Sequence, residues 1–193
     1  FEQSWNGYKY WISFSPYPKA DDSKENPHIL ASNDLQRWVE PEGFYNPLDE
    51  IGKAFKKGIV YNSDPELVYN SDTKELECWW RYVNDDKNQM ILYRRCTKDG
   101  RKWAEKELMV ETSRDKLDYV SPAIIYEDNV YKMWSVGGGY RVQYTESLDG
   151  HYWKPIQYLD IQYENKNLKT WHLSVIGTSS ENYKMIISAF DNS

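Results

Sequence analysis

The sequence predicts an all-β fold made of repeated four-stranded units, and three observations support this prediction. Three segments share one pattern, which runs Ser or Thr, any residue, Asp, Gly or Leu, two residues and Trp. Strand-like runs of aromatic and β-branched residues recur in the same order around these segments. The repeat measures 57 residues from Asp64 to Ser121 and 52 from Ser121 to Leu173, which suits one blade of a β-propeller.

The shared pattern has the chemistry of a β-hairpin turn. It occurs as SNDLQRW at 32–38, TKDGRKW at 97–103 and SLDGHYW at 147–153. The Asp carboxylate can accept backbone N–H groups within a tight turn, and Gly adopts the positive φ that such a turn needs. Leu35 replaces this Gly in the first copy. Three copies in one chain indicate repetition, and each Trp is expected to begin the outgoing strand.

The strand-like runs divide the chain into blades. They are YKYWISF at 8–14, LECWWRY at 76–82, YKMWSV at 131–136 and YKMIISAF at 183–190. We predict a partial blade over residues 1–45, a blade over 61–112, a blade over 119–160 and a partial blade over 170–193. Residues 39–60 form a longer linker, predicted to be an inserted loop with one helical turn at EIGKAFKK. Because open sheet edges are an aggregation hazard, we expect the native protein to contain more sequence on both sides.

Composition limits the classes of partner. The 193 residues carry 24 basic and 30 acidic side chains, a formal net charge of −6, and lack a Lys/Arg run. Nucleic acid and an anionic membrane are therefore not predicted partners, since both need a basic surface. Aromatic residues make up 16% of the chain and are expected to supply much of the core.

Cysteine and histidine usage predicts neither a metal site nor a cofactor. The two cysteines, Cys78 and Cys96, cannot make a disulfide framework, and no CxxC or His/Cys cluster indicates zinc. The simplest interpretation is two reduced, buried thiols, with pairing across adjacent strands of one hairpin as the alternative.

The blade-start motifs SDP at 63–65 and VSP at 120–122, together with the three aspartate hairpins, resemble the five-bladed β-propeller of the arabinanase and invertase superfamily of glycoside hydrolases. Of five such blades, this chain would cover about three and a half. The phrases WNGYKYW, SPYP, ENPHILASND and YNSDPELVYN look like the propeller platform of receptor-binding tail proteins from phages, particularly staphylococcal ones.

The first resemblance implies three inward carboxylates: an Asp base from the first blade, an Asp from the second and a Glu acid from the third. Asp64 falls where the second-blade Asp belongs, and the first-blade strand would lie upstream of Phe1. Ser121 precedes Pro122 where the enzymes have Glu, and a hydroxyl cannot replace that acid. Catalysis is therefore not favoured, although Asp118 and Glu25 are further carboxylates that could point inward. If the protein is an enzyme, Asp64 is the candidate catalytic residue.

The candidate ligand-binding residues are Asp64, Arg81, Ser121, Trp134 and His172. The resemblance implies that His172 faces the axial pocket or a bound ion, whereas a lone His is more often a hydrogen-bonded core residue. Arg81 either pairs with Asp64 or lies on the solvent face of its strand. Trp134 either stacks on a sugar or packs in the core. Asp64, Ser121 and His172 are expected to converge at one end of the central channel.

Further aromatic residues are candidates for stacking on sugar faces, with core packing as the alternative for each. They are Trp5, Tyr17, Trp79, Tyr140 and Trp171.

Three functions follow as hypotheses. The first is a non-catalytic module of a phage tail that binds a bacterial cell-wall glycopolymer, repeated in a homotrimer for avidity and located outside the cell or on the virion. The second is a glycoside hydrolase acting on furanosides or related glycans. The third is a structural platform without a ligand. Ser121 favours the first and third, and the aromatic residues favour the first.

Overall fold

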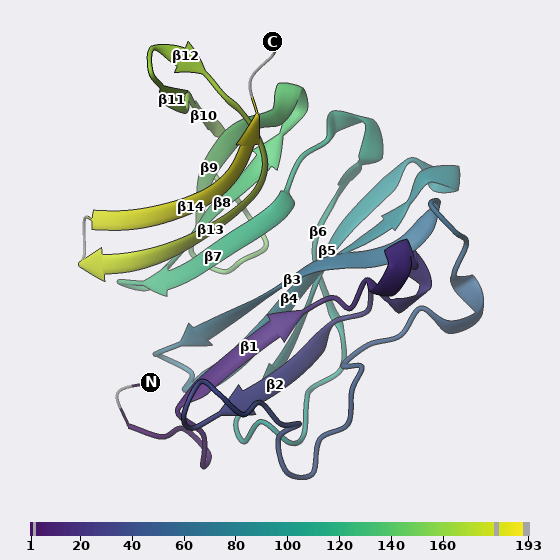
Figure 1. The fold of residues 1–193 in the computed structure, drawn as a ribbon, viewed down its shortest axis with the longest axis vertical. Coiled ribbons are helices and arrows are strands. Elements are labelled where there is room, and N and C mark those ends of the chain that lie inside the picture. The colour runs from purple at the N-terminus through teal and green to yellow at the C-terminus, as the bar shows by residue number, and fades with distance from the viewer. Residues whose placement is uncertain (2, 180–181, 191–193) are drawn as a thin grey trace. The chain divides into compact units, whose positions relative to one another are not determined.

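The structure is a computed structural model and describes residues 1, 3–179 and 182–190. The chain forms two compact units, Phe1–Glu111 and Thr112–Ser193, both built from antiparallel strands (Figure 1). In the described ranges the helical elements are short 3₁₀ turns: η1 (Pro18–Ala20), η2 (Asp22–Lys24), η3 (Gly52–Ala54), η4 (Asp85–Lys87), η5 (Arg114–Lys116) and η6 (Gly138–Tyr140). The all-β prediction is confirmed. No helix of the described part is long and apolar enough to cross a membrane.

The first unit contains a two-stranded and a four-stranded sheet. The smaller sheet pairs β1 (Tyr10–Phe14) with β2 (His28–Ser32), seen as the purple strands of Figure 1. The larger sheet has the order β3 (Val60–Asn70), β4 (Glu75–Asn84), β5 (Gln89–Thr97) and β6 (Glu107–Ser113). Each strand pairs with its neighbour in sequence, which is the simple meander expected of one propeller blade.

Aromatic rings fill the core of the first unit, as the composition predicts. Trp79 and Trp80 on β4 are fully buried. A cluster of Ile29, Phe44, Leu48, Cys78 and Trp80 packs with Trp11, Leu67, Tyr93 and Trp103. Two members of this cluster, Phe44 and Leu48, come from the 39–60 linker, so that loop is anchored by its apolar residues. The predicted helical turn in the linker is present as η3.

The second unit repeats the meander. Its four-stranded sheet has the order β7 (Val120–Glu127), β8 (Val130–Gly137), β9 (Arg141–Ser147) and β10 (Gln157–Leu159). Two pairs follow: β11 (Gln162–Tyr163) with β12 (Lys166–Asn167), and β13 (Lys169–Ser179) with β14 (Asn182–Phe190). Residues Ala123, Trp134, Val136, Val142, Leu173 and Val175 form the buried cluster of this unit. Because β13 supplies two of them, the last pair packs on the preceding sheet.

A partly buried ion pair between Lys132 and Glu127 also links the four-stranded sheet of the second unit to β14, through Tyr183. The Lys132 Nζ lies 2.9 Å from the Glu127 carboxylate and donates to the Tyr183 hydroxyl at 2.6 Å. That hydroxyl donates to Glu127 at 2.7 Å. These hydrogen bonds hold the pKa of Glu127 below its usual value, so the pair stays charged at neutral pH.

The three aspartate hairpins have the same hydrogen bonds, which confirms their predicted equivalence. In the second copy the Asp99 carboxylate accepts backbone N–H groups of Arg101 and Lys102 at 2.9 Å, and the Thr97 hydroxyl donates to it at 3.2 Å. The Thr97 hydroxyl in turn accepts the Gly100 N–H at 2.9 Å. The corresponding bonds form around Ser32 and Asp34 and around Ser147 and Asp149.

The tryptophans of these hairpins occupy matching environments. Trp38, Trp103 and Trp153 are all half-buried. The residue after each Trp donates its N–H to the carbonyl just before the Ser or Thr, at 2.9, 2.8 and 2.9 Å in chain order. Leu35, which replaces the turn Gly, has a φ of 63°. This conformation is strained for Leu35, which has a Cβ atom, and is unstrained for Gly100.

Both cysteines are free thiols, as the simplest interpretation expects. Cys78 is buried and Cys96 is half-buried. They lie on adjacent strands, but Cys78 is opposite Arg95 and Cys96 is opposite Glu77. The two side chains therefore point to opposite faces of the sheet, and burial raises the pKa of Cys96 to about 12.

Replacing the turn carboxylate should destabilise the fold. Asp99→Ala removes the acceptor of two backbone N–H groups, and we expect a loss of about 1 kcal/mol in the free energy of unfolding, as for a lost helix cap. Backbone donors hold the pKa of Asp99 below its usual value, so this contribution is present at neutral pH and is lost as the pH falls through the folded-state pKa. Urea unfolding at pH 7 and pH 3 measures both effects.

The matched control is Asp86→Ala. Asp86 makes an ion pair with Lys56 in which both side chains are 54% exposed, so its loss should change stability by a few tenths of a kcal/mol. Equal unfolding curves for the Asp99 and Asp86 variants would contradict a structural role for the hairpin carboxylate.

Candidate functional site

The first strand of each four-stranded sheet carries a β-bulge near its start. In β3 the extra residues are Asp64 and Pro65, and in β7 they are Ser121 and Pro122. Asp64 and Ser121 both have a φ of 50°, in the left-handed region that non-glycine residues rarely occupy. Bulges redirect side chains and occur often beside functional sites. Asp64 and Ser121 are therefore equivalent positions of the two sheets, both in strand register and in backbone conformation.

Asp64 forms a shielded ion pair with Arg81. The Arg81 Nη1 lies 2.6 Å from the Asp64 carboxylate, with side-chain exposures of 6% and 17%. Arg81 sits opposite Ser63 in the register and also donates to its hydroxyl at 3.3 Å. The prediction that Asp64 is the partner of Arg81 is confirmed, and the alternative of Arg81 on the solvent face is wrong. The guanidinium favours the ionised form of the carboxylate, whereas the low exposure of the pair opposes it.

Glu25 is placed close to this pair by the segment around it. The adjacent Asn26 accepts a hydrogen bond from Asn62 at 3.1 Å, and Asn62 lies two residues before Asp64 on β3. The Asn26 oxygen also accepts the Ile51 N–H at 3.4 Å. Asn26 and Asn62 are 7% and 1% exposed, so these bonds are well shielded from water. They fix the chain beside β3 and leave Glu25 half-buried next to the bulge.

The environment of Glu25 moves its titration into the neutral range. Burial is the largest cause, and the negative charges of Asp64 and Asp22 add to it, so that the pKa of Glu25 rises from 4.5 to about 7. Arg81 opposes this shift without cancelling it. A carboxyl that binds and releases a proton near pH 7, beside a second carboxyl paired with a guanidinium, is suited to acid and base catalysis.

In the second unit, Ser121 contacts His172. The Nδ1 atom of His172 lies 3.2 Å from the Ser121 hydroxyl, and the two residues come from β7 and β13. The bulge of β13 falls between Thr170 and His172, so Trp171 occupies the position that follows the last regular pair. By register Trp171 follows the last regular pair, as Asp64 and Ser121 do, but it is not among the residues with a positive φ, and the equivalence of His172 with those two positions stays a prediction.

Two of the predicted aromatic residues lie in the cores. Trp134 is 6% exposed and packs between Tyr144 and Tyr183, with ring centroids at 4.9 and 4.8 Å. Trp79 is fully buried and donates to Glu77 at 2.8 Å. The stacking role expected of Trp134 is therefore corrected to core packing, because its ring faces are covered by other aromatic rings.

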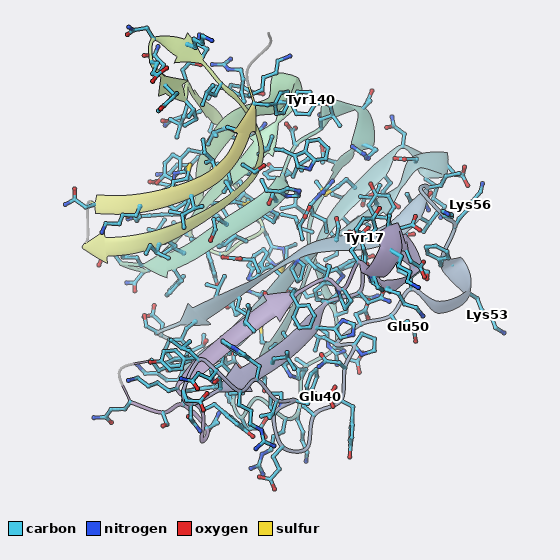
Figure 2. All side chains as sticks on the ribbon, in the orientation of Figure 1. Tyr17, Glu40, Glu50, Lys53, Lys56 and Tyr140 are labelled. Atoms are coloured by element: carbon cyan, nitrogen blue, oxygen red, sulfur yellow. The ribbon has the colours of Figure 1, made fainter. Side chains whose placement is uncertain are left out.

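Other predicted aromatic residues lie at the surface. Tyr17, labelled in Figure 2, is 54% exposed. Tyr140 and Trp171 are 36% and 47% exposed. Trp5 is half-buried and stacks on Phe1 with the centroids 5.7 Å apart.

A buried amide organises the polar side of the second unit. Gln143 is 1% exposed, donates to Asp118 at 2.6 Å and accepts from Ser135 at 3.1 Å. Asp118 is half-buried and hydrogen-bonded. The space for the Gln143 amide depends on Gly137, because a Cβ there would lie 2.1 Å from its Nε2.

The structure thus brings together Asp64 with Arg81 in one unit and Ser121 with His172 in the other. The convergence of Asp64 with the second pair stays a prediction. Sequence reasoning named Glu25 only as one of two carboxylates that could point inward. Its pKa depends on burial and on the nearby charges of Asp64 and Asp22, and no sequence pattern marks those contacts.

Comparisons with known proteins were made in sequence and in structure. No family model matches the chain. The chain is 27% identical over 218 aligned positions to the A type blood N-acetyl-α-D-galactosamine deacetylase of Flavonifractor plautii, a match that covers 90% of this chain and 28% of that protein. The chain therefore spans less than a third of the length of this curated relative.

The structural matches show the fold. A crystal structure of an N-acetylgalactosamine deacetylase from F. plautii, in complex with blood group B trisaccharide, has a TM-score of 0.85 at 24% identity and covers 99% of this chain and 60% of that chain. An α-L-arabinanase from Penicillium chrysogenum, complexed with arabinobiose, has a TM-score of 0.57 at 18% identity and covers 92% and 52%. The fold is that of a β-propeller. The sheets are consistent with part of a propeller, and the number of five blades stays a prediction.

The titration of Glu25 can be measured directly. NMR of carboxyl-labelled protein should give a pKa near 7 for Glu25. Asp64→Asn should lower this pKa, because the substitution removes a negative charge that disfavours ionisation. Glu50→Gln, at an exposed position of the linker labelled in Figure 2, should leave it unchanged.

The same shift predicts a pH dependence of stability. Because the folded-state pKa lies above the unfolded value, Glu25 destabilises the fold increasingly as the pH rises from about 4.5 to about 7. Glu25→Gln should remove this part of the pH dependence. A pKa of about 4.5 for Glu25 would contradict the predicted shift. Parallel plots of unfolding free energy against pH for the wild type and Glu25→Gln between pH 4.5 and 7 would contradict it as well.

Gly137→Ala should destabilise the second unit. The added Cβ would displace the Gln143 amide from Asp118 and Ser135, and we expect a cost of about 1–3 kcal/mol, as for other overpacked sites. Gly177→Ala is the matched control on β13, where the nearest atom to a Cβ is Tyr183 Cε1 at 3.9 Å. Thermal unfolding of both variants measures the difference, and equal midpoints would contradict the requirement for glycine at 137.

Proposed function

We propose that this chain is part of a carbohydrate-active hydrolase, in which Glu25 moves the proton of the reaction and its pKa is raised by burial and by the charge of Asp64. The observation that carries the proposal is a carboxyl with a pKa of about 7 beside a shielded ion pair at a strained bulge. Perturbed carboxyl groups of this kind concentrate at active sites. The sequence and structure matches to carbohydrate-active proteins support the same class.

The proposed chemistry follows from the charges. Arg81 keeps Asp64 ionised, and the Asp64 charge raises the proton affinity of Glu25. Near pH 7 comparable fractions of Glu25 are protonated and ionised. The ionised form can take a proton from an attacking water, and the resulting acid can give that proton to the leaving group when the substrate bond breaks. Asp64 is shielded by Arg81, so its role in this scheme is to position charge rather than to contact the bond.

Two bonds fit this scheme. A glycosidic bond is the substrate of the arabinanase, and an N-acetyl amide is that of the deacetylase with which this chain shares 27% identity. For the amide, one group can accept a proton from water and then donate it to the leaving nitrogen. For the glycoside, Glu25 would donate its proton to the leaving oxygen, and a second carboxylate would have to activate the water or attack the sugar. The sequence match favours the amide of an N-acetylated sugar, while the aspartate motif at the blade start favours the glycoside.

The non-catalytic module proposed from the sequence rests on Ser121, which lacks an ionisable group. Glu25 weakens that reasoning, because it supplies a titrating carboxyl next to a different blade-start residue. Binding of a cell-wall glycopolymer, a phage tail location and a trimeric assembly stay proposals of lower rank. They predict retention of a glycan without turnover.

Turnover separates these proposals. The full-length protein is incubated with a blood group A oligosaccharide, for acetate release, and with an aryl α-L-arabinofuranoside, for aglycone release. Glu25→Gln should lower kcat on the active substrate by about 10²- to 10⁴-fold, the usual contribution of general acid and base catalysis. Glu50→Gln, the exposed control, should retain the rate.

Asp64→Asn should shift the pH optimum of the remaining activity to lower values, because it lowers the pKa of Glu25. Turnover that is insensitive to Glu25→Gln would overturn the proposed role. Glycan retention with neither acetate nor aglycone released would favour the binding module instead.

A further inference from the structure

The second unit holds a hydroxyl and an imidazole that the proposed role of Glu25 does not use. Ser121 lies in the bulge of β7, and His172 is the residue at which regular pairing of β13 resumes after its own bulge. The Nδ1 atom of His172 lies 3.2 Å from the Ser121 hydroxyl oxygen. The contact therefore joins two irregular positions of strands that belong to different sheets. Bulges of this kind redirect side chains beside active sites.

The strained backbone of Ser121 belongs to the repeat, and its partner does not. Asp64 occupies the equivalent bulge of β3 with the same φ of 50°. That bulge brings a carboxylate to a cation, Arg81, whereas the bulge of β7 brings a hydroxyl to a base. A serine hydroxyl within hydrogen-bonding reach of an imidazole is the arrangement that activates serine as a nucleophile. Nucleophilic serines on strained backbone occur in other hydrolases.

The imidazole is held from two sides, and strand pairing does not explain its contact with Ser121. The Trp171 ring lies 5.6 Å from the His172 ring, edge to face, and so limits its rotation. Ser188 lies opposite His172 in the register of β13 and β14, where opposite residues share one face. Nδ1 is nevertheless placed on the hydroxyl of Ser121, from the other sheet. A base that a third group orients is a further feature of an activated nucleophile.

We propose that Ser121 is a nucleophile, that His172 is its general base, and that the pair cleaves a carboxylic ester. In the tautomer with its proton on Nε2, His172 takes the hydroxyl proton through Nδ1 while Oγ bonds to the acyl carbon. The same proton passes to the alkoxide as the C–O bond of the ester breaks. Water then attacks the acyl-serine and gives a proton to Nδ1. That proton returns to Oγ as the carboxylic acid leaves.

An ester suits a pair of two groups. Its leaving group is an alkoxide, which departs with one proton from the imidazole, whereas the nitrogen of an amide is a poorer leaving group. The activity is distinct from the reaction proposed for Glu25. Glu25 belongs to the first unit and acts through water, and Ser121 belongs to the second unit and forms a covalent intermediate.

Diisopropyl fluorophosphate tests the pair, because an activated serine hydroxyl forms a P–O bond with it and releases fluoride. The full-length protein is treated with this reagent, and peptide mass spectrometry locates the adduct. We expect the adduct on Ser121. We also expect a burst of 4-nitrophenol from 4-nitrophenyl acetate, which the reagent abolishes. His172→Gln should slow modification of Ser121 by about 10²- to 10⁴-fold, the usual contribution of a general base.

The matched control is Ser188→Ala, which removes the exposed serine opposite His172. This variant should leave the rate of modification of Ser121 unchanged. Ser121→Ala should remove the adduct and the burst, and unfolding curves check that each variant folds. Absence of an adduct, an adduct on Ser188, or the same rate of modification in His172→Gln as in the wild type would overturn the proposal.

The two proposals fail separately, because one is read from an adduct and the other from turnover of glycans. An adduct on Ser121 without hydrolysis of either glycan substrate would overturn the role of Glu25 and support the pair. Hydrolysis that depends on Glu25, together with an unmodified Ser121, would overturn the pair and support the role of Glu25.

Discussion

The bulge that begins the first strand of each four-stranded sheet is the constraint on which the candidate site depends. Asp64 and Ser121 adopt a positive φ there, followed by Pro, whose missing N–H cannot take part in the sheet. At each bulge two residues of the first strand lie opposite one residue of the second strand. The side chain of Asp64 or Ser121 therefore leaves the regular alternation between the two faces of the sheet. In β3 this directs a carboxylate at Arg81, and that ion pair in turn sets the charge felt by Glu25.

The two sheets use equivalent positions for different chemistry. Arg81 opposes Ser63 in the first unit, and Val136 opposes Val120 at the matching place in the second. Trp80 and Tyr93 face each other in one sheet, whereas Ser135 and Gln143 do so in the other. The backbone repeat is therefore conserved within the chain while the side chains diverge. A titrating carboxyl belongs to the first unit, and a serine and histidine pair belongs to the second.

The charged groups that stabilise the fold differ from the residues that carry the proposed function. The hairpin carboxylates and the Lys132 and Glu127 pair bind groups within the fold, and their charges are satisfied locally. Glu25 differs because burial and like charges oppose its ionisation. Ser121 differs because its hydroxyl meets His172 from a strained backbone.

The sequence by itself determined the β class, the three equivalent hairpins and the helical turn of the linker. All of these follow from local turn chemistry or from period-2 patterning. Only the tertiary structure decided the pairing of Arg81 with Asp64, the burial of Trp134 and the pKa of Glu25. Each depends on contacts between segments distant in the chain, where register and desolvation, which leave no local signal, set the outcome.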